Sequence, residues 1–132
     1  MEKWKIVVLV VVALAVTGIM VLKFTNSPQK IEMPQAGEFT VVEVGSNVCI
    51  PCKLLVPVFE EMKTDFGDKV AIKKYEKSAE SEKAFSISII PTIIIYDDNA
   101  EEITRKIVTE QDVPNVRAWI TETLAGVGCE VE

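Results

Sequence analysis

A run of seventeen uncharged and almost wholly apolar residues, from Ile6 to Leu22, is the feature that most limits how this chain can fold. As a helix it would be about 25 Å long, at roughly 1.5 Å per residue, which is near the lower limit for crossing a hydrocarbon core of about 30 Å. A helix that is apolar on every face fits the core of a small soluble domain poorly, because too little protein surrounds it. We therefore predict an N-terminal transmembrane helix within residues 1–24.

The flanks of this run favour an uncleaved anchor. Trp4 and Phe24 extend its apolar length, so residues 4–24 are the expected membrane contact, and nearby lysines can reach the headgroups. The main alternative is a cleaved signal peptide, because Ala13-Leu14-Ala15 resembles a cleavage site, but apolar residues continue for seven positions beyond it. We expect a single-pass cell-membrane protein with an extracytoplasmic domain. A secreted domain after cleavage, or a domain facing the cytoplasm, are the alternatives.

The rest of the chain divides by composition into a linker, a domain and a tail. Residues 25–37 contain two prolines, a glycine and several polar residues, which is typical of a linker without its own core. Residues 38–126 are long enough for one compact domain, which we expect to be a monomer. Residues 127–132 form a short acidic tail. The net charge of −6 argues against nucleic acid as a partner, because no basic surplus exists to neutralise phosphates.

Hydrophobic periodicity predicts an α/β domain. Strands are expected where β-branched residues form a continuous run or alternate with polar residues. Helices are expected where apolar residues recur at three- and four-residue spacing. The predicted strands are 39–44, 69–75, 92–96 and 102–108, and the predicted helices are 49–65, 79–85 and 114–124. The first crossover implies a parallel strand pair, and the last hairpin adds antiparallel strands. We predict a mixed four-stranded sheet with helices on both faces.

Three cysteines and no histidine restrict the chemistry of the chain. Without histidine there is no Ser-His or Cys-His pair and no His-bearing zinc site. Cys49 and Cys52 are separated by two residues, a spacing at which a disulfide can close and reopen. They lie at the predicted start of a helix, which favours the thiolate. We expect Cys49 to be the exposed nucleophile and Cys52 the buried resolving thiol; a structural disulfide and half of a metal site are the alternatives.

The residues around this pair resemble the active site of the thioredoxin family. Cys49-Ile50-Pro51-Cys52-Lys53 matches the family's C-x-P-C-K motif, with Pro51 and Lys53 as supporting positions, and Pro57 matches its helix-kinking proline. Ile90-Pro91-Thr92 matches the family's cis-proline loop, which binds the substrate backbone; an ordinary proline at a strand start is the alternative. The resemblance covers roughly Phe39 to Leu124. It implies a thioredoxin-like fold that lacks the family's first strand and helix.

Two residues at the motif depart from the family pattern. Val48 stands where the family usually has tryptophan, and Ile50 replaces the usual glycine between the cysteines. The glycine that often follows the final hairpin is also missing near Val108. Residues between and beside the cysteines tune thiolate stability, so the redox potential and the reaction partner do not follow from the resemblance.

Glu43 is the third candidate for chemistry. It lies six residues before Cys49, where thioredoxins carry a buried aspartate that handles protons for the second cysteine. Independently, it interrupts an apolar strand, where a buried carboxylate would have a raised pKa and could act as a general base near neutrality. A half-exposed glutamate without a role is the alternative.

The resemblance implies a thiol–disulfide oxidoreductase. Its expected partners are protein disulfides or dithiols and a redox protein that recharges the Cys49/Cys52 pair, and it needs neither a cofactor nor a metal. Two other functions stay open: a non-catalytic thioredoxin-like binding module, and a metal-handling protein that uses Cys49, Cys52 and Cys129. Otherwise we expect Cys129 to be a mobile bystander in the tail, or a regulatory thiol.

Overall fold

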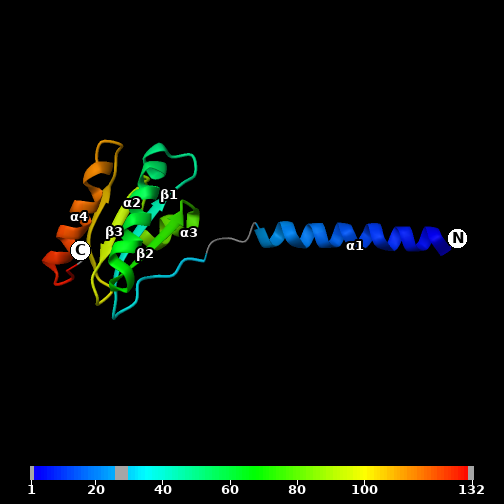
Figure 1. Cartoon of the computed structure of the whole chain (residues 1–132), viewed down its shortest axis with the longest axis horizontal. Helices are drawn as coiled ribbons and strands as arrows, with labels where there is room; N and C mark the ends of the chain where they lie inside the picture. The colour runs from blue at the N-terminus through cyan, green and yellow to red at the C-terminus, as the bar shows by residue number, and fades with distance from the viewer. Residues whose placement is uncertain (1, 26–29, 131–132) are drawn as a thin grey trace. The chain divides into compact units, whose positions relative to one another are not determined.

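The computed structural model of this protein describes residues 2–25 and 30–130 (Figure 1). These residues form two compact units, divided between Lys30 and Ile31. The first unit is the helix α1 (Glu2–Thr25), as the apolar run predicts. Its part from Glu2 to Val21 is long and apolar enough to cross a membrane, and none of it is buried by other parts of the chain. A signal sequence near an N-terminus has the same properties.

The second unit contains a four-stranded sheet and three α-helices, in the predicted order. Each of these strands and α-helices begins and ends within two residues of its predicted bounds, and the structure adds one short 3₁₀ helix that was not predicted. The elements are β1 (Phe39–Gly45), α2 (Ile50–Phe66), the short 3₁₀ helix η1 (Gly67–Lys69), β2 (Val70–Glu76), α3 (Ala79–Phe85), β3 (Thr92–Tyr96), β4 (Glu102–Ile107) and α4 (Val113–Gly126).

The sheet has the strand order β2-β1-β3-β4. β1 pairs in parallel with β2 and antiparallel with β3, and β3 and β4 form the predicted antiparallel hairpin. β1 is therefore central, and its residues from Thr40 to Gly45 are buried. This confirms the mixed four-stranded sheet, and it brings the C-terminal end of a central strand to the first cysteine.

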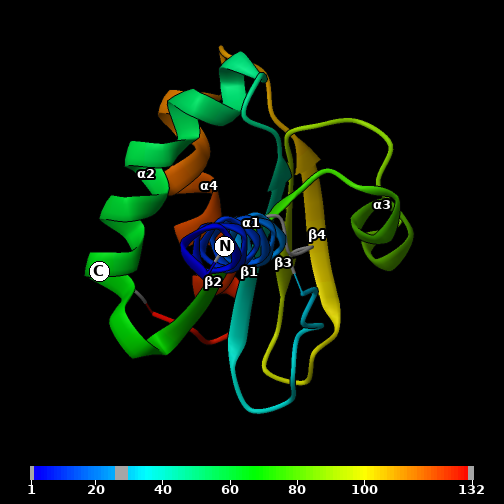
Figure 2. The ribbon, with the colours of Figure 1, turned by 90° about the vertical axis from the view of Figure 1, so that its right-hand side faces the viewer.

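Helices cover both faces of the sheet, and each face has its own apolar core. α2 and α4 lie on one side and α3 on the other (Figure 2). Side chains alternate along β1, so Val41 packs under α2 and α4, whereas Val42 and Val44 pack toward α3. By the same alternation Glu43 faces α2, which is the helix that begins at the cysteine pair.

The second unit begins before the predicted boundary at residue 38. Ile31 packs against the core on the α3 face. The Tyr75 hydroxyl donates to the Glu32 carbonyl at 2.9 Å and accepts from the Glu32 N–H at 3.1 Å, and the Gly37 N–H donates to the Asp98 carbonyl at 2.7 Å. Residues 31–37 thus lie on the domain, although we expected residues 25–37 to be a linker. They form neither strand nor helix, which agrees with the predicted loss of the first two elements.

The prediction that Cys129 is a mobile bystander is wrong. Its side chain is 7% exposed and belongs to the core under α2 and α4. After α4 ends, Gly128 adopts a φ of +92°, a conformation that glycine adopts at little cost, and the Cys129 N–H donates to the Leu124 carbonyl at 2.9 Å. This turn returns the chain to the core. Residues 131–132 of the predicted tail lie outside the described residues.

Candidate active site

Cys49 and Cys52 form a disulfide at the start of α2, with their Cα atoms 5.2 Å apart. Cys49 is the N-cap of this helix, and its Sγ accepts a hydrogen bond from the Cys52 N–H at 3.3 Å. Pro51 lies in the first turn, where a backbone N–H would have no acceptor within the helix, so the N–H that proline lacks is not missed as a hydrogen-bond donor. The sulfur of Cys49 therefore lies at the positive end of the helix dipole.

The two sulfurs differ in their access to solvent. Cys49 is half-buried, whereas the Cys52 side chain is only 1% exposed. This order of exposure is the one predicted from the sequence, and it leaves Cys49 as the sulfur that another molecule can reach. The neighbouring side chains of Val48 and Ile50 are 88% and 60% exposed, so an apolar surface borders Cys49.

Glu43 is fully buried, which excludes the alternative of a half-exposed position. Its side chain is 0% exposed, and neither carboxylate oxygen has a hydrogen-bond partner among the described residues. Burial raises the pKa of Glu43 from 4.5 to about 7, against the opposing charges of Lys74 and Lys63. Near neutral pH the group can therefore both hold and release a proton.

The Glu43 carboxylate and the Cys52 sulfur both lie close to Gly45. A Cβ atom built on Gly45 would lie 3.6 Å from Glu43 Oε1 and 2.8 Å from Cys52 Sγ. The structure thus brings together the buried carboxylate and the buried member of the cysteine pair. Our sequence reasoning did not single out Gly45, although a glycine at the end of an apolar strand is a signal that another group approaches the backbone closely.

The predicted cis-proline loop lies at the same end of β1. The Ile90–Pro91 peptide bond is cis, and Pro91 is buried. Thr92 begins β3 and pairs with Val44, the residue before Gly45. The Pro91 carbonyl accepts from the Val108 N–H at 3.0 Å, which ties the loop to the chain after β4. The loop is therefore at the level of the cysteine pair in the sheet.

Comparison with known proteins agrees with this geometry. The thioredoxin family model matches residues 19–122, which is more than half of the chain. The chain belongs to the thioredoxin family. Because it also carries the Cys49–Cys52 disulfide, this thioredoxin-family protein is a thiol–disulfide oxidoreductase.

Its relatives include two bacterial thioredoxins. Thioredoxin of Peptoclostridium acidaminophilum is 33% identical over 86 residues, which cover 62% of this chain and 78% of the relative. Thioredoxin of Rickettsia prowazekii (strain Madrid E) is 28% identical over 107 residues, which cover 80% of this chain and all of the relative. The matches therefore account for most of each relative's length.

Solved thioredoxin structures share the fold. Oxidised thioredoxin O2 of Arabidopsis thaliana superposes with a TM-score of 0.57 at 18% identity, covering 65% of this chain and 75% of that one. Thioredoxin f2 of Chlamydomonas reinhardtii superposes with a TM-score of 0.56 at 22% identity, covering 68% and 82%. At these identities the likeness concerns the fold of this thioredoxin-family protein alone.

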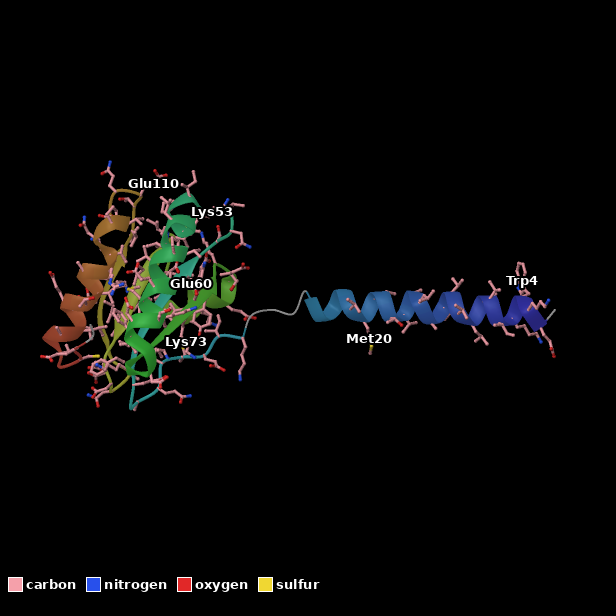
Figure 3. All side chains as sticks on the ribbon, in the orientation of Figure 1. Trp4, Met20, Lys53, Glu60, Lys73 and Glu110 are labelled. Carbon is pink, nitrogen blue, oxygen red and sulfur yellow. A yellow bond between two sulfur atoms is a disulfide. The ribbon has the colours of Figure 1, made fainter. Side chains whose placement is uncertain are left out.

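The supporting motif residues of this family member lie on α2. Pro57 is inside the helix, and because it has no N–H, the Lys53 carbonyl loses its usual partner one turn later. The Lys53 N–H donates to the Cys49 carbonyl at 3.2 Å. The side chains of Lys53 and Glu60 are on the exposed side of α2 (Figure 3). Lys53 is thus a solvated residue next to the site.

The structure gives no support to the metal-handling alternative for this thioredoxin-family protein. Cys52 lies against Gly45, the last residue of β1, whereas Cys129 lines a pocket of about 380 Å³ beside Phe39, the first residue of that strand. The Cys49–Cys52 pair is therefore at one end of this seven-residue strand, and Cys129 is at the other end. In the described parts of the chain, no three residues of the metal-binding types are close enough to hold an ion together.

Proposed function

We propose that this protein exchanges disulfides with protein substrates, with Cys49 as the nucleophile and Cys52 as the resolving thiol. The observation that carries the proposal is the arrangement of three groups at the end of β1. A half-buried sulfur at a helix N-terminus is bonded to a buried sulfur, and a buried carboxylate lies near that sulfur, beside Gly45. The first group can meet a substrate, and the other two can act only within the site.

The first step begins from the dithiol form. The Cys49 thiolate attacks one sulfur of the substrate disulfide, a bond forms between Cys49 and that sulfur, and the other substrate sulfur leaves as a thiolate that takes a proton from water. The helix dipole and the Cys52 N–H, which points at Cys49 Sγ, stabilise the attacking thiolate. The substrate backbone binds along Ile90, Pro91 and Thr92.

The second step releases the substrate. Glu43 accepts the proton of the Cys52 thiol, and the resulting thiolate attacks Cys49 Sγ. The bond between Cys49 and the substrate breaks, the second substrate sulfur leaves as a thiolate that takes a proton from water, and the Cys49–Cys52 disulfide forms. The burial of Cys52 supports this role, because substrates cannot reach it directly. A pKa of about 7 for Glu43 supports proton acceptance near neutrality.

The same site oxidises dithiols when the two steps run in reverse. Two electrons and two protons pass between the substrate and the cysteine pair in either direction, and no cofactor takes part. A separate redox partner restores the starting state of the pair, and its potential relative to that of the pair determines the direction of net electron flow.

Trapping of mixed disulfides tests this function. A Cys52→Ser variant expressed in its native cell cannot complete the second step, so substrates should stay bound to Cys49 as mixed disulfides. These adducts should appear on a non-reducing gel and disappear when reducing agent is added. Cys49→Ser is the matched control and should hold none. Equal adduct patterns for the two variants would contradict the assigned roles.

We further propose that α1 stays attached as a single membrane span and that the domain is a monomer on the extracytoplasmic side. The length and apolar surface of α1 support the span. Intact cells treated with a membrane-impermeant reductant and then with a membrane-impermeant maleimide should show labelling of Cys49, with Cys49→Ser as the control. Labelling only after lysis would place the domain in the cytoplasm, and a chain shortened by its N-terminal residues would indicate cleavage.

A further inference from the structure

Gly45 has no backbone reason to be a glycine. Glycine is needed where φ is strongly positive, and among the described glycines this holds for Gly37, Gly67 and Gly128 but not for Gly45. Gly45 is instead a regular strand residue that pairs with Glu76 in β2, and its carbonyl accepts from the Lys77 N–H at 2.7 Å. An alanine could adopt this conformation, so the reason for glycine lies in the space around it.

That space is filled by the active-site disulfide. A Cβ atom at Gly45 would lie 2.8 Å from Cys52 Sγ and 3.2 Å from Cys52 Cβ, and real Cβ atoms essentially never approach another heavy atom closer than 3.0 Å. The strand pairing holds the backbone of Gly45, and the first turn of α2 holds the backbone of Cys52. The overlap with Sγ would therefore have to be relieved by a shift of that sulfur, while the milder contact with Cβ is the same in the disulfide and the dithiol.

We propose that Gly45 is a positioning residue of the redox site: its missing side chain leaves the space that Cys52 Sγ occupies while it is bonded to Cys49. In the disulfide Cys52 Sγ is held within bonding distance of Cys49, whereas in the dithiol form no bond to Cys49 fixes its position. A methyl group at position 45 therefore disfavours the disulfide more than the dithiol. This inference rests on the proposed disulfide exchange and adds a determinant of its equilibrium.

The equilibrium with glutathione measures this effect directly. Two glutathione thiols reduce the Cys49–Cys52 disulfide, which takes up two electrons and two protons, and they leave as one glutathione disulfide. In full-length protein in detergent micelles, Gly45→Ala should raise the equilibrium constant for this reduction about tenfold, because one added methyl overpacks a buried site. For a two-electron couple this is a potential about 30 mV less negative.

Gly126→Ala is the matched control. Gly126 lies at the end of α4, and a Cβ atom there would meet nothing within 4 Å. This variant should keep the wild-type equilibrium constant. A Gly45→Ala protein whose constant equals that of the wild type would overturn the positioning role of Gly45 and leave the proposed function intact. A wild-type chain that never equilibrates with glutathione would count against the proposed function itself.

Unfolding by urea supplies a second measurement. Gly45→Ala should lower the unfolding midpoint of the oxidised protein clearly more than that of the reduced protein. In a Cys52→Ala background, where the sulfur is absent, Gly45→Ala should lower the unfolding midpoint by the smallest amount of the three. If Gly45→Ala prevents folding in all three backgrounds, the conflict is not with the sulfur and the proposal is wrong.

Discussion

Glu43 Oε1 and Cys52 Sγ both lie within 4 Å of the same point, the place where Gly45 would carry a Cβ atom. The carboxylate comes from the centre of β1 and the sulfur from the first turn of α2. Neither carboxylate oxygen has another hydrogen-bond partner in the described part of the chain. This relationship connects the stability of the domain to its chemistry, because the proton on Glu43 affects both.

Glu43→Gln should remove a pH dependence of stability. Burial raises the folded-state pKa of Glu43 to about 7 from an ordinary value of 4.5, so the folded protein keeps this proton while the unfolded chain loses it. The stabilisation is complete below about pH 4.5 and is lost as the pH rises through 7. The loss is about 3 kcal/mol of unfolding free energy in the oxidised wild type.

Urea unfolding of oxidised wild type and of Glu43→Gln, from pH 4 to pH 8, checks this prediction. The difference between the two curves cancels the contributions of other carboxylates, and the variant should gain stability relative to the wild type as the pH rises. Two parallel curves would mean that Glu43 titrates alike in the folded and unfolded states.

The same substitution should slow the second chemical step. Without a base beside Cys52, the mixed disulfide on Cys49 should resolve about a hundredfold more slowly near pH 7, the lower part of the range for general-base catalysis. Acid quenching of a single turnover, followed by a non-reducing gel, measures the adduct. Glu60→Gln, on the exposed side of α2, should resolve at the wild-type rate. Wild-type kinetics in Glu43→Gln would exclude Glu43 as the proton acceptor.

Cys129→Ser should destabilise the domain without changing its redox reaction. The side chain is buried in the core under α2 and α4, so a hydroxyl there would be removed from water at a cost of about 1–3 kcal/mol. Urea unfolding measures the loss, and the equilibrium constant with glutathione should stay the same. A fall in exchange activity at unchanged stability would instead assign Cys129 a part in the chemistry.

Tyr75→Phe should loosen residues 31–37. The Tyr75 hydroxyl forms hydrogen bonds with both the N–H and the carbonyl of Glu32, and its removal should lower the free energy of unfolding by about 1 kcal/mol. Hydrogen exchange at the Glu32 amide should become faster. Tyr96→Phe is the control, on a tyrosine of the same core, and should leave that amide unchanged. Equal exchange in both variants would mean that packing of Ile31 alone holds the segment.

The two corrections to the sequence-based boundaries have a common cause. The contact between Glu32 and Tyr75 joins residues 43 positions apart. The burial of Cys129 depends on a turn at Gly128 and on the core that α2 and α4 share. Both segments are short and lack the periodicity of a strand or a helix, so their local sequence resembles that of a linker and a tail. Their places depend on surfaces that exist only once the sheet has formed.

The amino-acid sequence by itself determined the apolar helix, the order of strands and helices and the cysteine pair at a helix start, and its resemblance to the thioredoxin family indicated the cis-proline. These features follow from local periodicity and from motif spacing, which act over a few residues. Only the tertiary structure decided that Glu43 is fully buried, with no hydrogen-bond partner for its carboxylate among the described residues, and that both Glu43 and Cys52 lie beside Gly45. It also decided that a side chain at Gly45 would overlap Cys52 Sγ. A strand and a helix must pack together before a carboxylate, a sulfur and a missing side chain can meet at one point.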